Sequence, residues 1–260
     1  MKGQINWKLF AILLAASIAS AILVLPYALS LSSEALKASP LPMEAIAAIS
    51  IIQSSVLFAI FIFAGLKLSQ KAGLGLPILE NWLDGKPVKA PLSAILPISI
   101  ALGVAAGVAI VALDAVFFYL GSPISLGQAE PPIWQGFLAS FYGGIGEEVM
   151  MRLFLMTALV WAFSKFQKTA DGKPASAMVW LAIIIASVLF GLGHLPVTAA
   201  MTAVTPLILA RALLLNGIGG MVFGWLYWKR GLESAIIAHF SADIVLHVLV
   251  PALSLAWLFG

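Results

Sequence analysis

Hydrophobic residues in this chain are gathered into seven long runs, and most polar residues lie in the connections between them. Each run is about as long as the 20 apolar residues that a helix needs to cross a bilayer. The runs cover residues 7–31, 44–68, 92–120, 133–164, 177–195, 203–228 and 233–258. This pattern predicts an all-α, polytopic transmembrane helical bundle that forms a single integral membrane domain over residues 1–260. Pro251 predicts a break in the last run, so we expect about seven to eight helices.

The composition also indicates a protein that lies in a lipid bilayer. The chain is 62% hydrophobic and only 10% charged, with a mean hydropathy of +1.07, which is far from the composition of soluble domains. Cysteine is absent, and this excludes a disulfide, a thiolate metal site and a cysteine nucleophile. We therefore expect the lipid bilayer to be the first partner of the chain.

Basic residues alternate between the connections. Eleven of the fourteen Lys and Arg residues lie at the N-terminus and in the second, fourth and sixth connections, whereas the first connection holds only Lys37 and the third and fifth hold none. By the positive-inside rule the N-terminus is cytoplasmic. We expect a bacterial or archaeal plasma membrane, because the chain ends without a eukaryotic retention signal. The net charge of +3 is dispersed over these connections, so no nucleic acid partner is expected.

The second connection, residues 69–91, is the one long stretch between runs that mixes polar and apolar residues. Its apolar side chains, such as Leu79 and Trp82, alternate with charged ones, such as Glu80 and Lys86. This mixture fits an amphipathic helix that lies on the cytoplasmic interface of the membrane. A loop that folds onto the bundle fits the same residues equally well.

Two adjacent carboxylates, Glu147 and Glu148, interrupt the fourth hydrophobic run, and Arg152 follows in the same run. A carboxylate in hydrocarbon costs several kcal/mol, so such groups usually mark a functional site. Glu148 and Arg152 are four residues apart and share a helix face, which predicts an ion pair. Glu147 points about 100° away, so the two carboxylates should not face one partner. Three glycines before the pair allow a neighbouring helix to approach closely: Gly143, Gly144 and Gly146.

All three histidines of the chain fall in hydrophobic runs. His194 ends the fifth run, and Phe190, four residues earlier, can pack against its imidazole. His239 and Asp243 in the seventh run also share a helix face. Asp243 either orients the imidazole by accepting its ring N–H, or joins it in binding a metal ion or polarising a carbonyl, or the two form a structural hydrogen bond. His247 lies one turn further and is expected to have a supporting role.

Two further charged residues lie within runs, Asp114 in the third and Arg211 in the sixth. Because charged groups in spans pair with one another, we expect a structural ion pair between them. In the sixth run, Asn216 and the segment Gly220–Gly224 are interpreted as devices for close helix packing.

Three separate runs thus offer Glu147, His194, and His239 with Asp243. One carboxylate and two imidazoles, from Glu147, His194 and His239, could hold zinc or another divalent metal ion with a water in the open position. Without a metal, Glu147 and His194 could activate water while His239 and Asp243 stabilise the oxyanion. Both schemes predict hydrolysis of an amide within the membrane or at its edge, and the residues do not decide between them.

At these residues the sequence resembles the CPBP family of intramembrane proteases, which includes the type II CAAX prenyl endopeptidases of the Rce1 kind and the Abi proteins. The motifs of this family are Glu-Glu-x-x-x-Arg, Phe-x-x-x-His, and His-x-x-x-Asn or Asp. They occur here in that order, at residues 147–152, 190–194 and 239–243. The likeness covers about residues 133–250, which we expect to be the protease core.

The resemblance implies an intramembrane endopeptidase, of the metallo- or glutamate type, whose site opens toward the cytoplasm. Its substrate would be a membrane-associated protein or peptide, prenylated or not. The resemblance implies that Glu147 and His194 activate water, and that His239 and Asp243 serve the oxyanion or a metal ion. An anionic Asp243 donates no hydrogen bond, which favours the metal-binding or histidine-orienting role for it. The other motif residues would be supporting residues: Glu148, Arg152 and Phe190.

Two other functions would use the same residues. A proton-coupled transporter also places carboxylates and histidines within spans, and a non-catalytic scaffold could bind a partner in the bilayer.

If Glu147 and His239 belong to one site, they must lie at a similar depth in the membrane. At 1.5 Å per residue, Glu147 lies about 25 Å and His239 about 10 Å from the cytoplasmic ends of their runs. Either the fourth helix protrudes into the cytoplasm or the seventh begins deeper.

Overall fold

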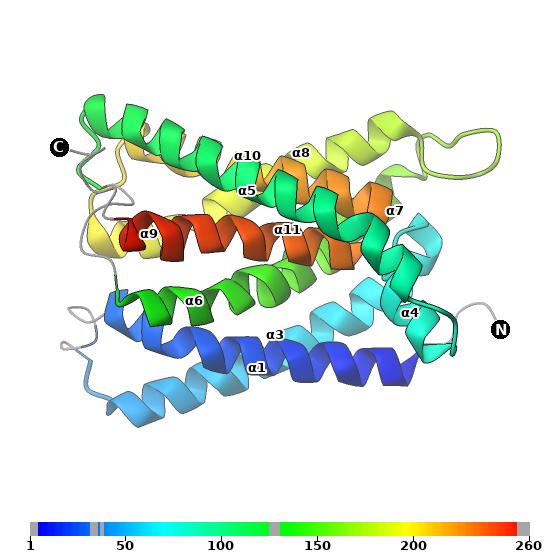
Figure 1. Ribbon diagram of the computed structural model, residues 1–260, viewed down its shortest axis with the longest axis horizontal. Helices are drawn as coiled ribbons and strands as arrows, with labels where there is room; N and C mark the ends of the chain where they lie inside the picture. Colours follow the sequence, from blue (N-terminus) through cyan, green and yellow to red (C-terminus); the bar gives the residue numbers. More distant parts are fainter. Residues whose placement is uncertain (1–4, 32–35, 37–38, 125–130, 254–260) are drawn as a thin grey trace.

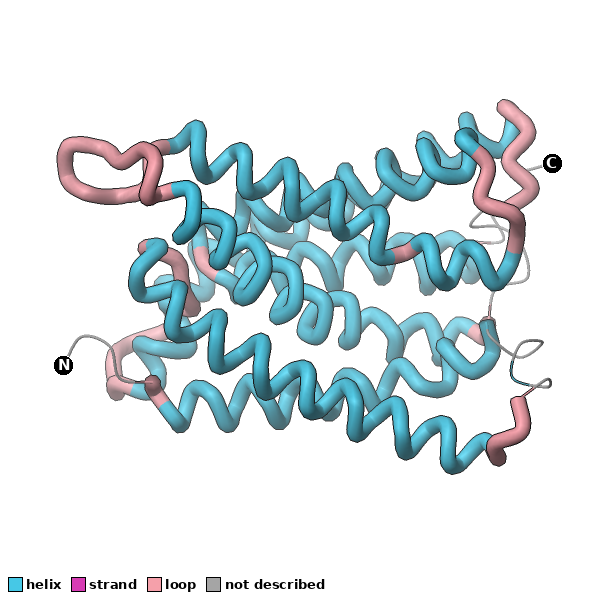
Figure 2. Tube along the Cα trace, turned by 180° about the vertical axis from the view of Figure 1, so that it is seen from behind, coloured by secondary structure: helices cyan, strands magenta, loops and turns pink. Residues whose placement is uncertain are grey.

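The computed structural model describes residues 5–31, 36, 39–124 and 131–253. Over these residues the chain forms a bundle of long helices that run back and forth between two ends (Figures 1 and 2). Six of the described helices are long and apolar enough to cross a membrane. This confirms the predicted all-α transmembrane bundle. The six are α1 (Trp7–Leu31), α3 (Met43–Ala72), α5 (Lys89–Tyr119), α8 with α9 (Ser176–Gly193 and Leu195–Met201), α10 (Pro206–Arg230), and α11 with η3 and α12 (Leu232–Ile244, Val245–Leu249 and Val250–Ala252).

The fourth hydrophobic run forms one further long helix through the bundle, which we call the fourth rod. The middle of this rod is unusual. The rod is helical without a break from Ile133 to Phe163, but its middle part is π-helical. Its segments are α6 (Ile133–Phe141), η1 (Tyr142–Glu147), η2 (Val149–Met156) and α7 (Thr157–Phe163). π-Helical turns are rare and often occur at functional sites. Here they coincide with the charged residues of the run.

Turn chemistry sets the ends of the helices next to the site. The Thr205 hydroxyl accepts a hydrogen bond from the Ile208 N–H at 3.3 Å and so caps the start of α10. Gly231, with φ of 93°, separates α10 from α11 by a single residue, because a left-handed conformation there favours glycine. His194 lies between α8 and α9, and Pro196 occupies the first turn of α9.

Small residues bring the central helices into close contact, as the glycine runs predicted. A Cβ atom at Gly144 would lie 3.1 Å from the Cβ of Phe240 in α11, and one at Gly220 would lie 2.6 Å from Ser187 in α8. Both glycines therefore mark places where two helices pack without an intervening side chain. The result is that the fourth rod, α8, α10 and α11 surround one central region.

The connection between α3 and α5 is a short helix that is docked on the bundle. This helix, α4, spans Pro77–Leu83, and the Glu233 carboxylate in α11 accepts hydrogen bonds from the Ile78 and Leu79 N–H groups at 2.9 and 2.8 Å. A carboxylate suits this position because the first N–H groups of a helix lack partners within it. The segment is therefore helical and folds onto the start of α11, while its place on the cytoplasmic interface stays a prediction.

The position at which α11 begins explains how Glu147 and His239 reach the same depth. Glu147 and His239 contact one another at 3.7 Å, although α11 starts at Leu232, 7 residues before His239, and the fourth rod continues 16 residues past Glu147 to Phe163. At 1.5 Å per residue, these lengths are about 10 Å and about 24 Å. The turn between α10 and α11 is therefore set back into the bundle. The Leu232 N–H donates to the Gly75 carbonyl next to α4 at 3.0 Å, so this connection covers the turn.

The last described helix ends one residue after Pro251. Helical structure continues from α11 through η3 and α12 to Ala252, and Leu253 is in a turn, so the break that Pro251 predicts stays a prediction. The end of the predicted seventh run and any short eighth segment fall on residues 254–260, which lie outside the described residues. The same holds for Lys2 and Lys37.

Candidate functional site

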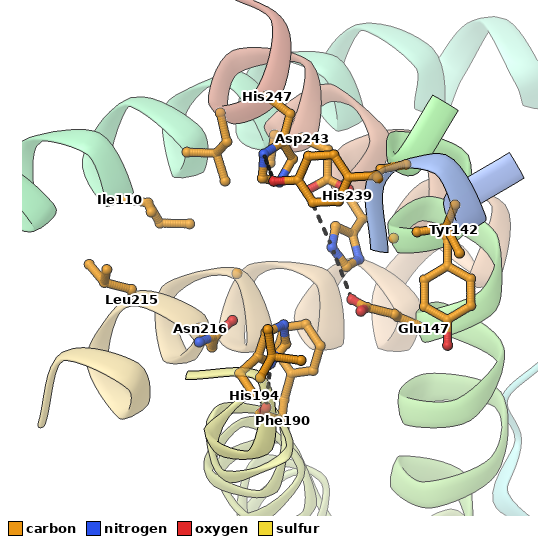
Figure 3. Close-up of a pocket in the computed structure, with 18 of the residues that line it drawn as sticks. Ile110, Tyr142, Glu147, Phe190, His194, Leu215, Asn216, His239, Asp243 and His247 are labelled. Atoms are coloured by element: carbon orange, nitrogen blue, oxygen red, sulfur yellow. Dashed lines mark hydrogen bonds and ion pairs between the residues drawn. The ribbon is translucent and has the colours of Figure 1, made fainter. Parts of the chain in front are cut away.

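A cavity of about 410 Å³ lies between the helices and contains the residues that the sequence singled out (Figure 3). Its wall includes Glu147 from η1, His194 at the end of α8, and His239 and Asp243 from α11. Side chains of α1, α5, α9, α10 and η3 complete the wall. The structure therefore brings the four predicted catalytic residues to one hollow, although they come from three separate hydrophobic runs.

Glu148 lies beside this cavity and holds two basic groups at once. Its Oε1 is 2.9 Å from Arg152 Nη1, which is the ion pair that the spacing predicted, and both side chains are buried. The same oxygen is 2.7 Å from His239 Nδ1. Because a carboxylate accepts and an imidazole N–H donates, His239 carries a proton on Nδ1 in this contact. Glu148 therefore joins the fourth rod to α11 as well as neutralising Arg152.

Both glutamates face the same histidine, which corrects the sequence-based expectation. Glu147 Oε2 lies 3.7 Å from His239 Nε2, while Glu148 contacts Nδ1 on the other side of the ring. The expectation assumed an α-helix, in which neighbouring residues point about 100° apart. The chain is π-helical on both sides of Glu148, and the wider turn of a π-helix reduces that angle. The two nitrogens of one imidazole then reach both carboxylates.

Asp243 does not orient His239 through a hydrogen bond. Its Oδ1 is 3.7 Å from His239 Nε2, which is longer than a hydrogen bond, and Glu148 has taken the other ring nitrogen. The carboxylate of Asp243 instead lies against the backbone of η1. A Cβ atom at Gly143 would overlap this carboxylate and lie 3.2 Å from His239 Nε2. Gly143 is therefore required for the close approach of both side chains to the fourth rod.

Aromatic rings fix the plane of His239. Phe223 in α10 stacks on the imidazole, with centroids 4.5 Å apart and an angle of 21°, and Phe190 meets its edge at 5.9 Å. The guanidinium of Arg152 lies 5.1 and 5.4 Å from the centroids of these two phenyl rings, within the range of cation–π attraction. Arg152 thus supports the His239 imidazole indirectly, through the rings of Phe190 and Phe223 and through Glu148.

His194 presents one free nitrogen to the cavity. Its Nδ1 lies 2.8 Å from the Phe190 carbonyl oxygen, and because a carbonyl only accepts, this contact places the proton of the neutral ring on Nδ1. The ring also packs edge-on against Phe190, with centroids 4.8 Å apart and an angle of 87°, as the spacing predicted. Nε2 is left with its lone pair and can accept a proton from a molecule in the cavity.

The donor set does not match a zinc site as the side chains are arranged. Among the described residues, no three His, Asp or Glu side chains are grouped so that they could hold one metal ion. His239 has its Nδ1 engaged by Glu148, and its Nε2 stands 3.7 Å from the Glu147 and Asp243 carboxylates. The predicted set of Glu147, His194 and His239 therefore lines one cavity without forming a tetrahedral cluster.

Two more predicted polar residues frame the cavity. The Arg211 Nε donates to Asp114 Oδ1 at 2.6 Å, and its Nη2 lies 2.6 Å from the same oxygen, which confirms the predicted structural ion pair. His247 Nδ1 is 3.2 Å from the Tyr27 hydroxyl, so this histidine connects η3 to α1. Arg211 and His247 also line the cavity.

Three cavity residues were missed or interpreted differently from the sequence. Tyr142 lies on the wall beside Glu147 (Figure 3), but a spacing of five residues puts it on a different face of an α-helix and on the same face only in a π-helix. Asn216 was interpreted as a packing residue, yet it also lines the cavity. Phe223 lies within the glycine-rich segment of α10, and no pattern in the sequence pointed to its stacking on an imidazole.

Residues 129–245 match the family model described as Type II CAAX prenyl endopeptidase Rce1-like. The matched segment contains the three motifs, and it agrees with the family that the motifs had indicated. Searches of curated proteins and of solved structures gave no significant match.

Proposed function

We propose that this chain is an endopeptidase that uses water activated by Glu147 and His194. Residues 129–245 match the family model of Rce1-like type II CAAX prenyl endopeptidases, which supports the proposal. Its substrate is a membrane-associated protein or peptide. The observation that carries the proposal is the convergence of Glu147, His194 and His239 on one cavity inside a membrane bundle. In this proposal, residues 133–250 form the catalytic part and the first three long helices enclose it.

Glu147 and His194 act on the water. Glu147 is the one glutamate of the pair with a partly accessible side chain, 20% exposed against 0% for Glu148, so it can reach a molecule in the cavity. The water oxygen forms a bond to the carbonyl carbon while Glu147 takes one of its protons. The free Nε2 of His194 accepts a hydrogen bond from the other water hydrogen and so orients the attack.

His239 stabilises the oxyanion that forms on the carbonyl oxygen. Its Nδ1–H donates to Glu148 at 2.7 Å, and a second proton on Nε2 gives a cationic donor directed at the cavity. Three carboxylates surround this ring, at 2.7, 3.7 and 3.7 Å, so its positive charge is balanced. Preorganised donors of this kind act strongly where water is excluded. When the C–N bond breaks, Glu147 returns its proton to the leaving nitrogen.

Glu148 is a positioning residue in this scheme. It does not contact the cavity water or the substrate, but it fixes the ring of His239 and supplies the negative charge that favours its protonated form. Arg152 in turn pairs with Glu148 at 2.9 Å, so the buried carboxylate has a counterion. Chemistry at His239 therefore depends on a buried chain of Arg152, Glu148 and His239.

The packed base of the cavity fits a hydrolase better than a transporter. Beyond His239, toward α4, the side chains of Leu153, Met156 and Leu226 are fully buried, and the Thr157 and Tyr227 hydroxyls share a buried hydrogen bond of 2.8 Å. A substrate would meet this base rather than pass through it, which argues against a permanently open channel. A proton-coupled transporter is the alternative to the protease, and substrate flux in proteoliposomes without any peptidase activity would favour it.

The proposal is tested by incubating the purified protein with a library of labelled peptides and analysing the products by mass spectrometry. The wild-type protein should cleave a subset of the library, and Glu147→Gln and His194→Ala should lose that activity. A matched control is Asn81→Ala, which alters a residue of α4 outside the cavity and should cleave at the wild-type rate. Cleavage by Glu147→Gln at the wild-type rate would show that the assigned mechanism is wrong.

A further inference from the structure

The cavity extends from the catalytic residues toward one end of the bundle only. Several of the other lining residues lie near the end where α9 joins α8 to α10: Leu31 ends α1, Val197 and Thr198 lie in α9, and Arg211 is in the second turn of α10. In Figure 1, α9 is at the left end, while α4 and the beginning of α1 are at the right end. The cavity therefore leads from His239 to the end of the bundle that is opposite α4.

Toward α4 the same cavity is closed by core side chains. Ile183, Leu226 and Leu232 have no exposed surface, and Tyr227 has 1%. The hydroxyls of Ser99 and Ser234 form a buried hydrogen bond of 2.6 Å between α5 and α11 in this region. The base of the site is thus as tightly packed as a protein interior. Among the described residues, packed side chains therefore close the cavity toward α4, and its lining reaches the α9 end.

The charges of the two ends differ strongly, and this difference orients the bundle in a membrane. The α4 end carries Lys8, Lys67, Lys71, Lys86, Lys89, Lys165, Lys168, Lys173, Lys229 and Arg230. Among the described residues, the connections at the α9 end hold no Lys or Arg, and the acidic Glu44 lies at the start of α3 there. Lys and Arg accumulate on the cytoplasmic side of membrane proteins. The α4 end is therefore the cytoplasmic end.

We infer that the catalytic cavity opens on the extracytoplasmic side of the membrane and takes its substrate from there. The substrate class is then a peptide segment on the outer side of the membrane, next to a membrane anchor, such as part of an exported protein or peptide. This is the reverse of the cytoplasmic opening that the family resemblance implied. The inference depends on the proposed function only for the statement that the ligand is a peptide to be cleaved.

The lining of the cavity fits such a ligand. Most of the wall is apolar, with Ile110, Leu215 and Leu246 among its residues. Arg211 is the one Lys or Arg among the described lining residues, and it is already paired with the buried Asp114. A peptide segment with largely uncharged side chains suits a wall of this kind, because a charged side chain would be buried there without a partner.

The absence of cysteine from the chain makes the direction of the opening directly measurable. Single cysteines are introduced at three sites: in the cavity by Asn216→Cys, on exposed α9 by Val197→Cys, and in the exposed α7–α8 connection by Phe166→Cys. The proteins are expressed in bacterial cells and treated with a membrane-impermeant maleimide before and after permeabilisation. We expect Asn216→Cys and Val197→Cys to be labelled in intact cells and Phe166→Cys only after permeabilisation. Labelling of Asn216→Cys only after permeabilisation, or in neither state, would overturn the inference.

Vesicles of known orientation separate this inference from the proposed function. The peptide library is added outside right-side-out vesicles and, in parallel, outside inside-out vesicles that contain the protein. Cleavage in the right-side-out vesicles alone supports the extracytoplasmic opening, and cleavage in the inside-out vesicles alone refutes it while leaving the protease intact. If labelling follows the expected pattern but detergent-solubilised protein cleaves nothing, the proposed function fails and the position of the opening stands.

Discussion

Replacing Glu148 by glutamine should destabilise the protein far more than the same change at Glu147. The Glu148 side chain is fully buried and its Oε1 contacts both Arg152 and His239, at 2.9 and 2.7 Å. Glu148→Gln keeps the shape of the side chain but removes its charge, so the guanidinium of Arg152 is left buried without a counterion. Breaking a buried ion pair by removing one partner costs about 3–5 kcal/mol. We expect a loss of unfolding free energy of that size.

The magnitude is measured by titrating the folded protein with sodium dodecyl sulfate in mixed micelles and following the loss of helix. Glu147→Gln serves as the matched control, because it makes the same chemical change at the neighbouring residue, whose side chain is 20% exposed and has no ion pair shorter than 3.7 Å among the described residues. It should unfold at nearly the wild-type detergent concentration. Equal losses of stability in the two variants would refute the reasoning.

A double variant isolates the electrostatic cause. Combining Glu148→Gln with Arg152→Met removes the stranded charge, and replacing a buried ion pair by groups of similar volume is often nearly neutral. The double variant should therefore recover most of the stability that Glu148→Gln loses, which is a strongly non-additive result. Its peptidase activity should stay low, because His239 then lacks the negative charge of Glu148. Additive losses of stability would show that Arg152 is held by its contacts with Phe190 and Phe223 and not by charge.

Three further predictions concern the site itself. Glu147→Gln should lower the rate of cleavage by about 100-fold or more, since a positioned general base contributes about 10²–10⁴-fold; a rate assay on folded protein checks this, and a rate near that of the wild type would contradict it. Gly143→Ala places a Cβ atom on the Asp243 carboxylate and should cost about 1–3 kcal/mol of unfolding free energy. Gly217→Ala, with no atom within 4 Å of its Cβ, should be neutral, and equal effects in the two variants would contradict the close approach. Activity should survive dialysis against a strong chelator, because three metal ligands are not grouped at the site among the described residues; loss of activity that zinc restores would contradict this.

The fold was predictable because length and hydropathy are sufficient to define membrane helices. The ion pairs of Glu148 with Arg152 and of Asp114 with Arg211 followed from helical spacing and from the cost of unpaired charge in a bilayer. The edge-on packing of Phe190 on His194 followed in the same way. These predictions needed only regular α-helical geometry or complementary charge.

The details of the site were less predictable because they depend on irregular geometry. Both glutamates reach His239 because the chain around Glu148 is π-helical. No residue pattern in the sequence predicts a π-helical turn. One interpretation of the sequence had Asp243, on the same helix, accept the ring N–H of His239, whereas the Nδ1 contacts Glu148 on another helix. A contact between helices requires their packing, which here depends on how close Gly143 lets α11 approach.

In the proposed reaction, Glu147 and His194 activate a water molecule that cleaves a peptide bond. This reaction is tested by running the cleavage in water enriched in oxygen-18 and measuring the masses of the products of one peptide by mass spectrometry. We expect one heavy oxygen in the new terminal carboxylate of the wild-type product, and little or no product with Glu147→Gln or His194→Ala. Equal product formation by the wild-type protein and both variants, with the same isotope incorporated, would contradict it.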